Sequence, residues 1–224
     1  MIGRFDIESP PIDDSLSRMV ETHRMKTGQD YAAILMFGLW GTVDCSPEVR
    51  LYAAYRHLET NPEDGPSWLE TARVHMEEGE ADRALAIVDE LERLECPGLY
   101  PNLYSEDPEV HRAHFLADSG GLEAALELLD GMRGRHGESP VYHYALGTVL
   151  HEKGDHPAAA VAYGDAAMAL EDFRREAEEE DMLEDLNVDF AAAASFLEAA
   201  RKAAEAGRRF DGGRPFELAD FRVE

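Results

Sequence analysis

Histidine is the residue type in this chain that first raises the question of metal or acid–base chemistry. The sequence contains nine histidines, and His111 and His114 stand three residues apart. A helix would place both on one face, where they could supply two ligands to a metal ion. A third ligand at a suitable spacing is missing, and scattered surface histidines are the common case. The sequence therefore predicts no metal site.

A second histidine group resembles part of a zinc-protease motif. That motif needs two histidines four residues apart, with a glutamate beside the first, on one unbroken helix. Here His151-Glu152 is followed by His156, and Gly154 interrupts the helix between them. The spacing therefore fails for a catalytic zinc.

Three polar residues near the C-terminus imitate the start of a calcium loop. Asp185, Asn187 and Asp189 have the spacing of its first ligands. Phe190 stands where that loop requires glycine, and Phe196 where it requires glutamate. A turn that caps a helix is the better interpretation. Because a glycine-rich phosphate loop is also missing from the sequence, we predict no cofactor, no catalytic residues and no enzymatic activity.

The two cysteines indicate the compartment rather than chemistry. Cys45 and Cys96 are too few for a disulfide framework, have no spacing that pairs them with a histidine, and fit a reducing compartment. The N-terminus, MIGRFDIESPPIDD, lacks an apolar signal core. The longest apolar run, Ala32–Gly41, is about half of what a membrane span requires. We therefore expect a soluble, cytoplasmic protein.

Charge narrows the class of partner. The chain has 47 acidic and 21 basic residues, a net charge of -26. Such a field repels nucleic acid and anionic membranes and attracts basic segments. Solubility alone is the simpler explanation. We predict another protein, with a basic or apolar segment, as the partner, and neither nucleic acid nor membrane.

The elements that position these side chains are most regular over Ser139–Asp172. Apolar residues there fall on one face of each of two helices, and Gly154-Asp155 supplies a tight turn between them. Small side chains allow the two backbones to approach closely, while one tyrosine fills the remaining space. The packing residues are Leu146, Gly147, Leu150, Ala159, Tyr163 and Ala166.

This stretch resembles a tetratricopeptide repeat (TPR), a helix pair of 34 residues with small and large residues at fixed positions. Three less regular copies precede it. The turn glycines Gly79, Gly120 and Gly154 are separated by 41 and then 34 residues, which places an insertion of about seven residues at 99–105. We assign repeats to 31–64 (divergent), 65–98, 106–139 and 140–173.

Several residues depart from the repeat pattern. Arg50 and His57 replace residues that are usually small, and His75 replaces one that is usually apolar. Residues 174–209 read as a degenerate repeat or capping helices, with a separate, acidic first helix over Arg174–Leu186. A terminal repeat needs one polar, solvated face, which this stretch would provide.

The resemblance implies an all-α, right-handed superhelical solenoid of antiparallel helix pairs. An N-terminal arm and helix occupy 1–30, the TPR-like repeats 31–173, and a tail 210–224 follows the capping helix. Its apolar Phe216, Leu218 and Phe221 indicate that the tail folds back. The alternative is a short docking segment.

The resemblance also implies a function and a site. Most TPR proteins bind other proteins on a concave face lined by the first helix of each pair. An adaptor or scaffold that binds a peptide or helix is the leading hypothesis, and a secretion or assembly chaperone that holds a client is the alternative. An enzyme, or an acidic mimic of nucleic acid, is a less favoured class. The partner-binding residues at these positions would be Leu69, Arg73, Met76, Val110, His114, Val141, Tyr144, Thr148 and His151.

Overall fold

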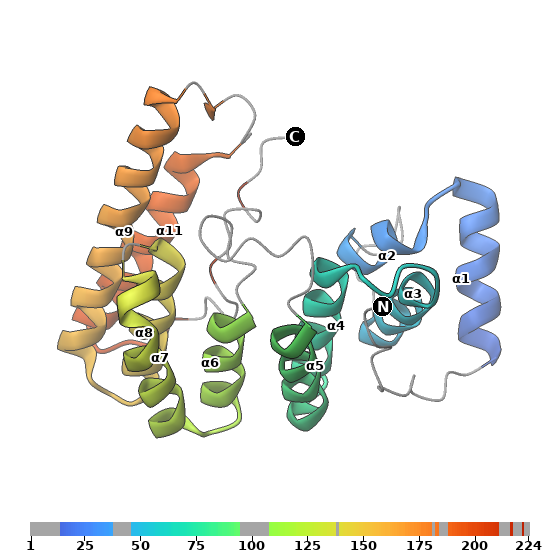
Figure 1. Cartoon of the computed structure of the whole chain (residues 1–224), viewed down its shortest axis with the longest axis horizontal. Coiled ribbons are helices and arrows are strands. Elements are labelled where there is room, and N and C mark those ends of the chain that lie inside the picture. Colours follow the sequence, from blue (N-terminus) through green and yellow to red (C-terminus); the bar gives the residue numbers. More distant parts are fainter. Residues whose placement is uncertain are drawn as a thin grey trace. The chain divides into compact units, whose positions relative to one another are not determined.

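A computed structural model of the chain describes residues 14–37, 46–94, 108–137, 139–180, 182–183, 188–210, 216 and 221. Helices dominate this part of the chain (Figure 1). They are α1 (Asp14–Thr27), α2 (Tyr31–Phe37), α3 (Pro47–Thr60), α4 (Gly65–Glu77), α5 (Ala81–Leu94), α6 (Pro108–Asp118), α7 (Leu122–His136), α8 (Pro140–Glu152), α9 (His156–Glu179) and α11 (Phe190–Glu205). The chain divides into two compact units, Met1–Leu99 and Tyr100–Glu224, called unit 1 and unit 2 below.

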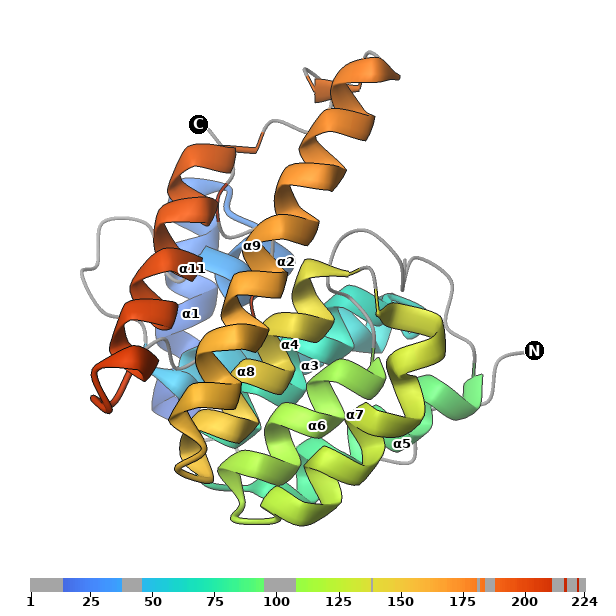
Figure 2. The same cartoon turned by 90° about the vertical axis from the view of Figure 1, so that its left-hand side faces the viewer.

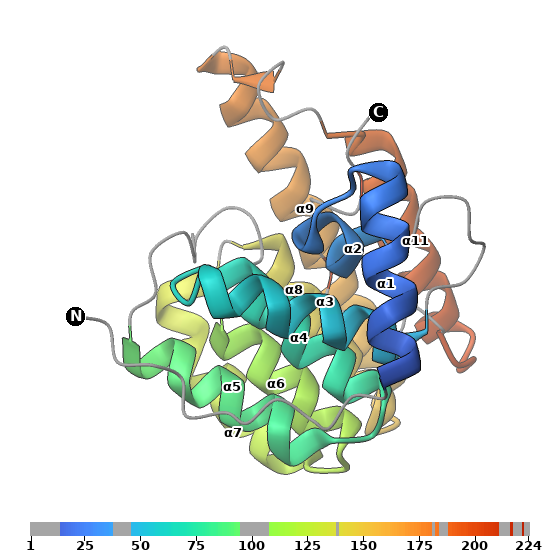
Figure 3. The ribbon, with the colours of Figure 1, turned by 90° about the vertical axis from the view of Figure 1, so that its right-hand side faces the viewer.

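Unit 1 consists of α1 and two helix pairs. Helix α2 packs on α3 and α4 on α5, while α3 and α4 contact each other (Figure 3). Helix α1 begins at Asp14 and ends before Gly28, within the region where we expected an N-terminal helix, and Val20 anchors it in a small core with Ile34. Met19 of the same helix is 46% exposed. Helix α1 contacts α3.

Unit 2 contains two hairpins and a final helix. The pairs α6/α7 and α8/α9 contact each other through α8, which packs against both α6 and α7. Figure 2 shows α11 lying beside α9, whose C-terminal turns extend past the end of α8. The core includes Ala113 of α6, Leu129 of α7 and the predicted packing residue Tyr163 of α9.

The turns within the hairpins α4/α5, α6/α7 and α8/α9 share one geometry. Gly79, Gly120 and Gly154 have φ angles of +76°, +86° and +86°, the left-handed region that glycine enters without strain. In each turn the next residue donates its backbone N–H to a carbonyl one turn back in the first helix, as Asp155 does to Leu150 at 2.9 Å. Repetition of this turn explains the period in the sequence.

The close approach predicted for the last hairpin is also present. A Cβ at Gly147 would lie 2.7 Å from two ring carbons of Tyr163, closer than such atoms approach. The ring of Tyr163 therefore packs directly against the backbone of Gly147. Paired helices, glycine turns and this small-to-large packing confirm an all-α, TPR-like repeat fold.

The end of the last repeat differs from the prediction. We expected a break near Asp172 and a separate helix over 174–186, but α9 continues without interruption to Glu179. Phe173 and Ala177 prolong the buried face of α9 at helical spacing, and the stretch from Asp172 to Glu179 contains neither glycine nor proline. The exposed Glu176 and Glu178 form its solvated side, as expected for the acidic run.

Candidate protein-binding face

The predicted binding residues of unit 2 lie on α6 and α8, the first helices of their hairpins. They are less accessible than the resemblance implied, because the structure buries all but one of them. Val110, His114, Val141, Tyr144 and His151 are buried, and Thr148 is half-buried. Their use by a partner stays a prediction, and other parts of the chain cover them in this structure.

Aromatic side chains from the C-terminal part of the chain cover Tyr144. Its ring centroid lies 5.6 Å from that of Phe196 in α11 and 5.6 Å from that of Phe216 in the tail. On another side, His114 of α6 lies 6.0 Å away. These spacings are those of favourable aromatic pairs. Tyr144 is only 1% exposed as a result.

A larger group of rings continues from this contact. Phe196 also packs against Phe210 at 5.2 Å and Phe221 at 5.7 Å, and Phe216 contacts Phe221 at 5.5 Å. Phe216 is 2% exposed. We call Tyr144, Phe196, Phe210, Phe216 and Phe221 the aromatic cluster.

Two hydrogen bonds hold the backbone around this cluster. The N–H of Asp189 donates to the carbonyl of Phe221 at 2.6 Å, and Nε2 of His151 donates to the carbonyl of Arg208 at 2.8 Å. Burial lowers the pKa of His151, and the bond to Arg208 opposes that shift. The predicted fold-back of the tail is confirmed at its described residues.

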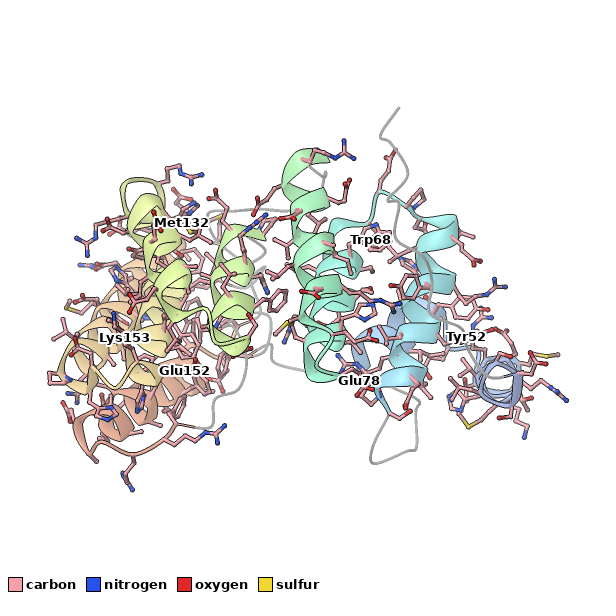
Figure 4. All side chains as sticks on the ribbon, turned by 90° about the horizontal axis from the view of Figure 1, so that it is seen from below. Tyr52, Trp68, Glu78, Met132, Glu152 and Lys153 are labelled. Carbon is pink, nitrogen blue, oxygen red and sulfur yellow. The ribbon has the colours of Figure 1, made fainter. Side chains whose placement is uncertain are left out.

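The rim of this face carries acidic side chains. Glu152 ends α8, next to Lys153 (Figure 4). Partial burial of its carboxylate raises the pKa of Glu152, the charge of Asp118 raises it further, and Arg209 opposes both. Burial likewise raises the pKa of Asp118. A basic residue at this rim, as Arg209 is, therefore relieves a repulsion between carboxylates.

The predicted residues of unit 1 have different surroundings. Leu69 is a core residue of α4, and Met76 is half-buried. Arg73 is paired with Glu70 at 3.0 Å, and Glu70 also pairs with Arg50 of α3. Arg73 is thus engaged within the unit. Their use by a partner stays a prediction.

Two of the histidines lie elsewhere than the sequence suggested. His111 and His114 are buried rather than on the surface, which corrects that expectation. The part of the chain that the structure describes holds no group of three potential metal ligands. Gly154 does separate His151 from His156, yet the turn brings their rings to 5.1 Å, a closeness that the linear motif concealed.

The carboxylate of Asp189 caps α11, accepting the N–H of Ala192 at 2.9 Å, as the capping interpretation predicted. Asp185, Asn187, Cys45, Cys96 and the insertion at 99–105 lie outside the described residues. Phe196 and Phe210 escaped notice as parts of a site. Their signal in the sequence was the recurrence of phenylalanine at 190, 196, 210, 216 and 221.

A separate groove of about 840 Å³ lies between the end of α7, the start of α8 and the second half of α9. His136, His143 and Phe173 line it, together with Met168, which is 62% exposed. Its charged residues include Asp172 and Arg175, which pair with each other. This groove is a second surface to consider for binding.

Comparison with known proteins adds little to this picture. No protein-family model matches the sequence, and no curated protein matches it significantly. A chain in the crystal structure of the APC/C hetero-tetramer Cut9-Hcn1 is similar, with a TM-score of 0.47 and 17% identity, over 86% of this chain and 39% of that chain. A likeness this distant carries no argument. In the described part of the chain, no helix is both long and apolar enough to cross a membrane.

Proposed function

We propose that this protein is a non-catalytic adaptor or scaffold that binds a segment of a partner protein on the first-helix face of unit 2. One observation carries the proposal: this face holds a side chain from outside the hairpins. Phe216, from the tail, is buried against Tyr144 of α8. A face that buries an aromatic side chain from a distant part of the chain has the chemistry to bury one from a partner.

Charge supports the same proposal. The net charge of -26 and the carboxylates of Asp118 and Glu152 at the rim favour basic residues in the partner. The proposal includes a cytoplasmic location and a protein partner rather than a nucleic acid. The structure adds no observation that favours the chaperone alternative, which stays a prediction.

The test is a selection of peptides from a random display library on the full chain. We expect saturable binders whose affinity falls at least tenfold with Thr148→Arg, because Thr148 is half-buried on the face and an arginine there would block it. Tyr144 and Val110 are unsuitable probes because their replacement would damage the core. Thermal unfolding must show that each variant remains folded.

Val161→Arg is the matched control, since this α9 residue is 64% exposed. Met168→Arg tests the groove beside α9 in the same assay. Failure to obtain any saturable binder would contradict the proposed function. Loss of binding with Met168→Arg, but not with Thr148→Arg, would move the site to that groove.

A further inference from the structure

The described tail residues contact the body of unit 2 mainly through rings. Phe216 touches Tyr144, Phe196 and Phe221, with centroid distances of 5.5–6.0 Å. Phe221 adds one backbone hydrogen bond, from Asp189. Phe216 joins a core that also contains Leu129 of α7 and Tyr163 of α9. The tail therefore adds to a face that the helices already form.

Basic residues enter this face ahead of the rings. Helix α11 ends at Glu205, and Gly207 turns the chain away with a φ of +59°. The backbone carbonyl of Arg208 then accepts the hydrogen bond from His151, and the positive charge of Arg209 acts on the carboxylate of Glu152. In chain order, the occupant of the face is a basic pair followed by Phe210, Phe216 and Phe221.

The acidic rim and the rings beside it thus match two features of one segment. The charge of Arg209 acts on the carboxylate of Glu152, and Phe216 contacts Tyr144 and Phe196. The tail is covalently attached, so its binding to the face is intramolecular and its effective concentration there exceeds that of a dilute free segment. A free segment with the same chemistry must overcome that advantage.

We propose that the tail is the resident occupant of the partner-binding face, and that the partner is a protein segment with a basic pair followed by phenylalanines, which displaces Phe216 and Phe221. This inference rests on the proposed function and names the partner's chemistry. The tail then weakens the apparent affinity for every partner, because a partner segment must compete with the covalently attached tail for the same face.

The probe is a labelled synthetic peptide of residues 208–224, RRFDGGRPFELADFRVE. Its affinity is measured by fluorescence anisotropy for the full wild-type chain and for full-length Phe216→Ala/Phe221→Ala. We expect the double variant to bind at least tenfold more tightly than wild type, because it has lost the competing rings. A peptide with Phe216 and Phe221 replaced by alanine should bind neither protein.

Two further variants make the result specific. Met19→Ala/Met25→Ala removes two exposed apolar side chains of α1 and should bind the peptide as wild type does. A peptide carrying Arg208→Glu/Arg209→Glu should bind the Phe216→Ala/Phe221→Ala double variant at least tenfold more weakly than the unchanged peptide does, because it places negative charges at an acidic rim. If the double variant does not fold, Phe221→Ala alone changes a half-buried ring and should give a smaller gain.

Equal affinity of wild type and the folded double variant, or binding by neither, would overturn the proposal. A wild-type dimer that disappears in the double variant would also overturn it, since the occupant would then be the tail of a second copy. The two levels of inference fail differently. Peptides from the display library that bind wild type and the double variant equally would leave the proposed function intact and remove only the role of the tail.

Discussion

The two units use different side chains to hold first helices against their neighbours. Unit 1 places polar groups inside and satisfies them with partners. Nδ1 of His75 donates to the carboxylate of Glu80 at 2.7 Å, and its Nε2 accepts from the hydroxyl of Tyr55 at 2.9 Å. His75 is fully buried. A position that the repeat pattern reserves for an apolar residue is thus polar and paired.

Unit 2 also buries polar groups, such as His151 bonded to the carbonyl of Arg208, but it adds close shape complementarity and apolar area. Gly147 admits the ring of Tyr163, and the aromatic cluster closes the face of α8. The comparison teaches that a repeat position tolerates a polar residue when a neighbouring helix supplies its partner, because burying an unpaired polar group is costly. Arg50, at a usually small position, obeys the same rule through Glu70.

The largest expected effect comes from breaking a paired polar group of unit 1. Glu70→Ala should destabilise the protein by about 3 kcal/mol, because it leaves Arg50 and Arg73 without their shared, nearly buried carboxylate. Urea unfolding followed by tryptophan fluorescence measures this, since Trp40 and Trp68 both belong to unit 1. Glu77→Ala removes the exposed partner of Arg50 and should cost less than about 1 kcal/mol. Equal losses would mean that burial does not decide the energetics.

Shape dependence in unit 2 predicts opposite signs for two similar changes. Gly147→Ala should cost about 1–2 kcal/mol, because its Cβ meets the ring of Tyr163 and overpacking exceeds the gain in helix propensity. Gly131→Ala, in α7, meets nothing within 4 Å and should stabilise by about 0.5–1 kcal/mol. Urea unfolding followed by circular dichroism would check both. A gain at both positions would refute close packing at Gly147.

Protonation should affect unit 1 through His75. Burial lowers its pKa, although Glu80 opposes the shift. The unfolded chain, with a histidine pKa of about 6.5, then binds the proton more readily than the folded protein. The stability from neutral His75 is present above about pH 6.5 and is lost as the pH falls through the folded pKa. The free energy of unfolding should depend less on pH in His75→Gln than in wild type, and an unchanged slope would contradict this.

The smallest effect is expected at an exposed ion pair of unit 2. Lys153 contacts Glu123 at 2.9 Å, with both side chains well exposed. Lys153→Ala should change the free energy of unfolding by less than about 0.5 kcal/mol, since solvent and salt screen such pairs. Chemical denaturation at low and high salt is the measurement. A loss above about 1 kcal/mol would mean that polar contacts contribute as much to the stability of unit 2 as to that of unit 1.

Local signals made most of the fold predictable. Glycine turns, the cap at Asp189 and small residues facing large ones depend on neighbours in sequence, so Gly79, Gly147 and Tyr163 were assigned correctly. The continuation of α9 depends on Phe173 finding a core, which the acidic composition around it concealed. Exposure of the predicted face was beyond sequence reasoning, because Tyr144 is buried by residues far along the chain.

The uninterrupted α9 limits how such a chain can be lengthened. Its 24 residues span about 36 Å at 1.5 Å per residue, and α11 lies against it. A duplicated unit inserted after Asp172 would begin inside a continuous helix and separate Phe173 from its core. A unit inserted before Ser139 would meet the short connection between α7 and α8 instead. A duplicated repeat can therefore be inserted between α7 and α8 without breaking a helix, but it cannot be inserted after Asp172 without breaking α9.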